Sequence, residues 1–75
     1  MTLADVPLQK ASRIRGFKDL SPSELCRLGA LGVREGASVT KLLKMPLRDP
    51  IECLVGPQLL ALEGWLLERI EVEPA

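Results

Sequence analysis

The acidic residues are the first candidates for chemistry, because the chain contains no histidine and no tyrosine. General bases must then come from carboxylates. Only Asp49 occupies a conformationally special place, between Pro46 and Pro50. A lone Asp beside a proline is more typical of a turn, where its carboxylate accepts local backbone hydrogen bonds. We therefore predict a structural role for Asp49 and no catalytic residue in this chain.

The two cysteines, Cys26 and Cys53, are too few for a closed zinc site, and neither belongs to a C-x-x-C pair. A disulfide between them stays open, but nothing indicates an oxidising compartment. We predict two small, buried, hydrophobic side chains. Direct sensing of ferrous iron is the weakest alternative, since iron would want several nitrogen or carboxylate ligands together. The glycines match no phosphate-binding motif. Taken together, these observations lead us to expect that the protein binds no metal and no cofactor and is not an enzyme.

The charges balance, with ten basic and ten acidic residues, which disfavours a general nucleic-acid binder. Residues 1–48 nevertheless carry a net charge of +5 and residues 49–75 a net charge of −5. Pairing of the first and last predicted strands would let the two halves compensate through cross-strand ion pairs. In this strand pairing, Arg13 and Arg15 would lie near Glu71 and Glu73.

No apolar run approaches the ~20 residues that span a bilayer. The first five residues, MTLAD, have neither the basic start nor the apolar run of a signal peptide. We therefore expect a cytoplasmic protein that is not embedded in a membrane.

The strongest local signal is a helix over residues 22–31. Ser21 is a natural N-cap, Pro22 fits the first helical position, and Glu24 completes an S-x-x-E capping box. Gly32 is the expected left-handed residue after the helix. The predicted packing face holds Leu25, Leu28 and Gly29, the glycine allowing close approach to a strand.

Five short strands surround this helix, and together they predict an all-β fold. Residues 1–9 read as a lead-in, with Pro7 breaking any regular element, and Gly16 is a candidate bulge in the first strand. The segment 64–67 reads as a single helical turn. We predict one domain over residues 1–75, a small five-stranded barrel with one inserted helix. Its strands cover residues 11–17, 37–45, 51–55, 58–63 and 68–73.

Strand alternation leaves an apolar surface outside this barrel. If Val39 and Leu43 face the core, Leu42 faces outward; the same alternation directs Leu54, Leu59 and Ala61 outward. Contiguous apolar patches on small soluble proteins tend to be contact surfaces, and self-association through Leu42, Leu54 and Leu59 is one form of contact. Two alternatives stay open: the N-terminal segment covers these residues, or a bulge at Lys41 shifts the register.

The segment 45–51 is the predicted stiff connection between the second and third strands. Pro46 and Pro50 restrict its backbone and that of the residues before them. It projects Arg48 and Asp49, which we add to the candidate partner contacts.

These motifs, in this order and spacing, resemble those of the FeoA family, small accessory proteins of bacterial ferrous iron uptake. The similarity runs from about Ile14 to Val72. It rests on LGALGV at 28–33 with Gly36, PLRDPI at 46–51, LAL at 60–62 and IEV at 70–72. The chain departs from the family pattern at Glu35, Arg48, Pro57 and Glu63. Contacts inferred from the family in the segment 45–51 and at the hairpin tip therefore stay undecided.

The resemblance implies an SH3-like β-barrel and a non-enzymatic role. It implies binding to FeoB, the membrane ferrous iron transporter that carries a cytoplasmic GTP-binding domain. A regulatory domain similar to the SH3-like C-terminal module of iron-dependent repressors is the alternative. This second function would require a basic groove, which the charge balance does not suggest.

Overall fold

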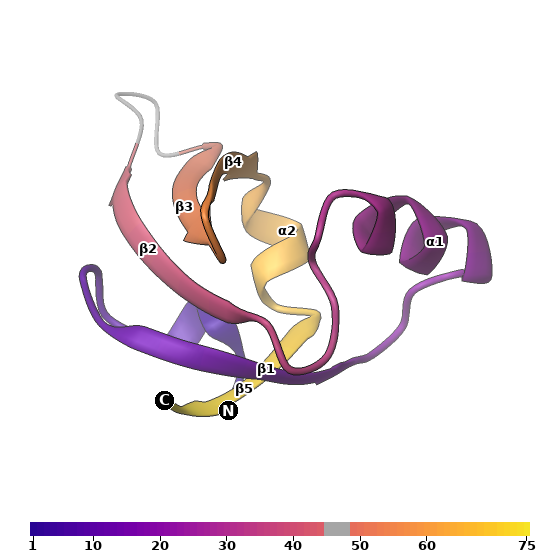
Figure 1. The fold of residues 1–75 in the computed structure, drawn as a ribbon, viewed down its shortest axis with the longest axis horizontal. Coiled ribbons are helices and arrows are strands. Elements are labelled where there is room, and N and C mark those ends of the chain that lie inside the picture. Colours follow the sequence, from indigo (N-terminus) through magenta and orange to yellow (C-terminus); the bar gives the residue numbers. More distant parts are fainter. Residues whose placement is uncertain (45–48) are drawn as a thin grey trace.

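The computed structural model describes residues 1–44 and 49–75, which form a curled antiparallel sheet with helices at its sides (Figure 1). The expected strands, the inserted helix and the later helical turn are all present, with bounds within two residues of those predicted. The elements are the 3-10 helix η1 (Leu3–Asp5), β1 (Ala11–Phe17), α1 (Pro22–Ala30), β2 (Ser38–Lys44), β3 (Ile51–Val55), β4 (Gln58–Leu62), α2 (Gly64–Leu67) and β5 (Ile70–Pro74).

The strands follow the order β4-β3-β2-β1-β5 in one sheet, and the described pairings are all antiparallel. The predicted pairing of the first and last strands is confirmed, with Ile14 opposite Val72. The register of this pair shifts between Ile14 and Gly16, which confirms the predicted bulge. Arg15 and Glu73 form an exposed ion pair, with Nε 3.2 Å from Oε1. Exposed pairs contribute at most about 1 kcal/mol, so this contact adds little to the stability of the β1–β5 pair.

Helix α1 begins as its sequence predicts. The Ser21 Oγ accepts the Glu24 N–H, and the Glu24 carboxylate accepts the Ser21 N–H at 2.7 Å. These two bonds satisfy backbone donors that an uncapped helix leaves open. Gly32, with φ of +89°, ends the helix in the left-handed conformation expected of it.

The packing of α1 differs from the prediction. Leu28 is buried, but Leu25 is 39% exposed, and a Cβ added at Gly29 would meet nothing within 4 Å. Gly29 therefore does not mediate a close approach to a strand. The helix lies to one side of the sheet in Figure 1, and Leu28 is its only buried residue.

The N-terminal nine residues are more than the expected lead-in, because Leu3 and Val6 are buried in the core. Helix η1 precedes Pro7, and Thr2 forms a β-bridge with Glu71. A three-residue helix is too short to leave a periodic apolar pattern, which explains why the sequence did not reveal it. The core is aliphatic apart from one cysteine: Leu3, Val6, Ile14, Leu28, Val33, Val39, Ile51, Cys53, Val55, Leu62, Leu66, Leu67, Ile70 and Val72.

Candidate functional site

A β-bulge in β2 decides which leucines reach the outer surface of the sheet. Thr40 lies opposite Leu54 and Lys41 opposite Cys53, but the next partner of β3, Glu52, lies opposite Leu43. Leu42 is thus the extra residue of the bulge. The predicted inward Leu43 and outward Leu42 are therefore wrong, and the alternative of a bulge at Lys41 is correct.

The outer apolar surface consists of Leu43, Leu54, Leu59 and Ala61, here named the β2–β4 face. Leu59 is 60% exposed, Leu43 49% and Leu54 37%. Leu54 and Leu59 lie directly opposite each other on β3 and β4, so their side chains form one cross-strand apolar pair. Leu42, predicted to belong here, is half-buried, and its carbonyl accepts the Gln9 side-chain N–H at 2.6 Å.

The N-terminal segment packs beside the bulge and leaves the centre of this face open. The Gln9 N–H donates to the Lys41 carbonyl at 2.7 Å, and Lys41 Nζ donates to the Ala4 carbonyl at 3.4 Å. Lys41 itself is almost fully buried, its aliphatic stem lying on the core side of the sheet. The alternative in which residues 1–9 cover Leu54 and Leu59 is therefore wrong.

Asp49 lies at the start of α2, where its carboxylate oxygen Oδ1 accepts the Gly64 N–H. Glu63, at the N-cap position of this helix, makes no capping hydrogen bond with its side chain. Asp49 supplies that acceptor from 15 residues away, so its predicted role as a backbone acceptor holds, although the donor is not local. A Cβ added at Gly64 would lie 3.0 Å from this oxygen. Arg48, the other candidate partner contact in the segment 45–51, lies outside the described residues.

The cysteines differ from each other. Cys53 is fully buried in β3, and burial raises the pKa of its thiol to about 11, an effect that the nearby Lys41 ammonium partly offsets. Cys26 is exposed on α1, so its predicted burial is wrong; both thiols are free. Within residues 1–44 and 49–75, no three or more Cys, Asp or Glu side chains gather as a metal site would require. Nor does any helix in these ranges have the length and apolarity to cross a membrane.

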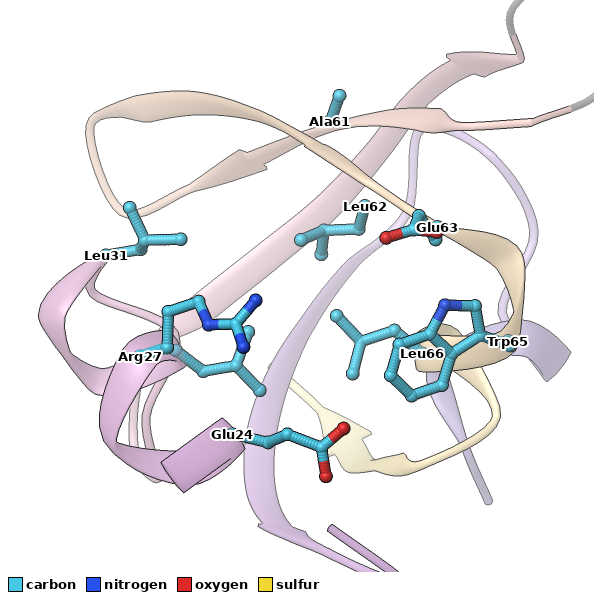
Figure 2. Close-up of a pocket in the computed structure, with 9 residues that line it drawn as sticks. Glu24, Arg27, Leu31, Ala61, Leu62, Glu63, Trp65 and Leu66 are labelled. Atoms are coloured by element: carbon cyan, nitrogen blue, oxygen red, sulfur yellow. The ribbon is translucent and has the colours of Figure 1, made fainter. Parts of the chain in front are cut away.

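A groove of about 170 Å³ opens beside the sheet, between α1, the end of β4 and α2 (Figure 2). Its apolar floor and walls come from Leu28, Leu31, Ala61, Leu62, Trp65 and Leu66.

Three charged side chains, Glu24, Arg27 and Glu63, surround the groove. The backbone N–H of Ser21 lowers the pKa of the Glu24 carboxyl, so this group is ionised at neutral pH. Sequence reasoning did not identify the groove. The one available signal was Trp65, a large apolar side chain beside a glycine, which is 44% exposed.

The sequence matches the family model described as the FeoA domain over residues 1–74. No curated protein sequence matches the chain. Two solution structures are among those to which the chain is similar. That of Chlorobium tepidum FeoA has 28% identity and a TM-score of 0.89, with 99% of this chain and 70% of that chain covered. That of Clostridium thermocellum iron(II) transport protein A has 25% identity and a TM-score of 0.85, with 100% of this chain but 46% of that chain covered.

A crystal structure of Stenotrophomonas maltophilia FeoA complexed with zinc is 29% identical, with a TM-score of 0.78. The match covers 97% of this chain and 89% of that one. That protein is described as a prokaryotic SH3 domain protein and a candidate activating factor of bacterial ferrous iron transport. The SH3-like fold predicted from the sequence is thereby confirmed.

Proposed function

This chain belongs to the FeoA family, and from that premise we propose that it is a non-enzymatic interaction module of ferrous iron uptake. Its partner is the cytoplasmic GTP-binding region of an FeoB-type transporter, which places the module in the cytoplasm. The similarity to FeoA structures at 28% and 29% identity supports a role in iron transport. The choice of partner rests on the sequence resemblance.

The β2–β4 face is the single observation that carries the proposal. Leu59, Leu54 and Leu43 each expose more than a third of their surface on one side of three neighbouring strands. Exposed apolar patches on small soluble proteins commonly mark protein contacts, and buried leucine contributes favourably to association. We assign this face as the principal contact surface, with Arg48 and Asp49 as further candidates at the β2–β3 connection.

The carboxylates at the starts of α1 and α2 have structural roles. The carboxylates of Asp49 and Glu24 are each engaged with a backbone N–H at the start of a helix. A general base must lie within hydrogen-bond reach of the proton that it abstracts, whereas these two carboxylates accept hydrogen bonds from helix-terminal N–H groups. Asp49 and Glu24 therefore stabilise the helix termini that they contact.

Isothermal titration calorimetry with the purified FeoB cytoplasmic domain tests the proposal. We expect saturable binding of the wild-type chain, and strong weakening by Leu54→Glu, which places a charge in the β2–β4 face. Leu25→Glu is the matched control, because Leu25 on α1 is exposed to nearly the same extent as Leu54. Absence of binding to both this domain and the intact transporter would overturn the proposal.

A further inference from the structure

Strand β4 is a sheet edge without the charges or proline that commonly block the addition of a further strand. Within the described ranges it pairs with β3 alone. Its sequence, QLLAL, contains no charge and no proline, which are the common means of blocking a further strand. The opposite edge, β5, is occupied, because Thr2 bridges Glu71 and the Val72 N–H donates to the Met1 carbonyl at 3.0 Å.

The hairpin turn determines which backbone groups of β4 point outward from the sheet. Gly56 and Pro57 form a two-residue loop, and the positive φ of Gly56, 57°, suits the first position of a type II′ turn. Val55 and Gln58 then form the hydrogen-bonded pair next to the loop. Since hydrogen bonding alternates along an antiparallel pair, the backbone groups of Leu59 and Ala61 point to the open edge.

The groove lies along this same edge. Ala61 and Leu62 of β4 border the groove, and Leu31, the C-cap residue of α1, faces Leu62 from across it (Figure 2). Leu31 is 42% exposed and Trp65, at the end of the groove, is 44% exposed. An open strand edge and an apolar groove thus share one boundary, which is the arrangement that strand-addition sites use: main-chain bonds give affinity and pockets select side chains.

The size and charge of the groove indicate what it can accept. Its volume, about 170 Å³, is below the ~300–1,000 Å³ of pockets that enclose small-molecule ligands. It suits an apolar side chain of an extended segment. Glu24 and Glu63 stand against Arg27 and against Arg69, whose guanidinium carbon lies 5.5 Å from the centre of the Trp65 ring. The charges around the groove therefore balance, which favours an uncharged apolar side chain in it.

We propose that an extended segment of the transporter's cytoplasmic region, carrying an exposed apolar residue, pairs with β4 as a sixth strand. Its backbone forms hydrogen bonds with the backbone groups of Leu59 and Ala61, and its apolar side chain enters the groove. This inference rests on the proposed function and adds the mode of binding. The β2–β4 face continues onto the added strand, so both surfaces serve one partner.

Amide hydrogen exchange followed by NMR tests this mode, using the full chain and the purified FeoB cytoplasmic domain. In the free protein, the amides of Leu59 and Ala61 should exchange rapidly, and those of Leu60 and Leu62 slowly. Binding should slow the exchange of Leu59 and Ala61 at least tenfold. Docking of side chains on the β2–β4 face without strand addition would leave both amides in rapid exchange.

Ala61→Pro supplies the matching variant, because it removes an edge N–H that no bond within the sheet requires. We expect a weakening of binding of tenfold or more, against less than twofold for Ala61→Ser, which keeps the N–H. Should Ala61→Pro fail to fold, Leu31→Glu in the groove should weaken binding to a similar degree, and Leu25→Glu outside it should not.

The outcomes separate the two proposals. If the wild-type chain does not bind the domain, the proposed function fails and this inference fails with it. If it binds but the Leu59 and Ala61 amides stay unprotected, strand addition is wrong while the proposed function stands. Self-association is the remaining outcome. It would appear as a concentration-dependent dimer in sedimentation that Ala61→Pro abolishes, while the Leu59 and Ala61 amides stay unprotected in the mixture with the transporter domain. That result would assign the edge to a second copy of this chain and would also overturn the inference.

Discussion

Shortening Leu59 to alanine should weaken partner binding while leaving the fold intact. Leu59 is 60% exposed on β4. Complete burial of a leucine side chain is worth about 1.5–3 kcal/mol, so burial of the exposed part in an interface contributes about 1–2 kcal/mol. Since about 1.4 kcal/mol corresponds to a tenfold change in affinity, Leu59→Ala should raise the Kd roughly 5- to 30-fold. Leu54, 37% exposed and directly opposite, should show a smaller effect of the same sign.

Calorimetric titration with the FeoB cytoplasmic domain measures these changes. Leu25→Ala is the control, because Leu25 is 39% exposed on α1 and belongs neither to the β2–β4 face nor to the groove lining. Denaturant unfolding should show that the three variants stay within about 1 kcal/mol of the wild type, as exposed substitutions usually do. Equal affinities for Leu59→Ala, Leu25→Ala and the wild type would refute the assignment of this face.

Three further predictions concern the fold and its titrating groups. Leu3→Ala should lower the free energy of unfolding by about 2–5 kcal/mol, because Leu3 is completely buried, whereas the exposed Leu8→Ala should change it by less than about 1 kcal/mol; equal effects would contradict the packing of η1. The lowered pKa of Glu24 means that its contribution to stability is present above its ordinary pKa of 4.5 and is lost as the pH falls through the lowered value. Glu24→Gln should thus flatten the acid decline seen in unfolding curves measured from about pH 6 to 3, and an unchanged slope would disprove this. Iodoacetamide should modify Cys26 in the native protein but Cys53 only after unfolding, because Cys53 is buried and its pKa is raised to about 11; mass spectrometry showing equal rates would argue against the described core.

The features that were predicted correctly depend on residues that lie close together in the sequence. The capping box of Ser21 and Glu24 is a contact over three positions, and its geometry is nearly independent of the rest of the fold. The alternation in β3, with Ile51, Cys53 and Val55 inward and Leu54 outward, follows directly from the period of a strand. Local patterns of this kind were enough to place the strands and both α-helices.

The features that the sequence did not settle depend on tertiary contacts. The bulge at Leu42 inserts one residue into a strand of similar residues, KLLK, in which no composition marks the shift. The contact of Asp49 with Gly64 joins positions 15 residues apart. The groove exists because α1 stands to one side of β4, and helix periodicity alone does not predict that separation. The bulge is the reason why the prediction placed Leu43 on the core side of the sheet.

The proposed contact between the β2–β4 face and the cytoplasmic domain of a ferrous iron transporter can be located residue by residue. The most direct measurement is an NMR titration of the isotope-labelled chain with the unlabelled FeoB cytoplasmic domain. We expect the largest amide shift changes and line broadening at Leu43, Leu54, Leu59 and Ala61. An unchanged spectrum at saturating partner concentration, or changes confined to β1 and β5, would contradict it.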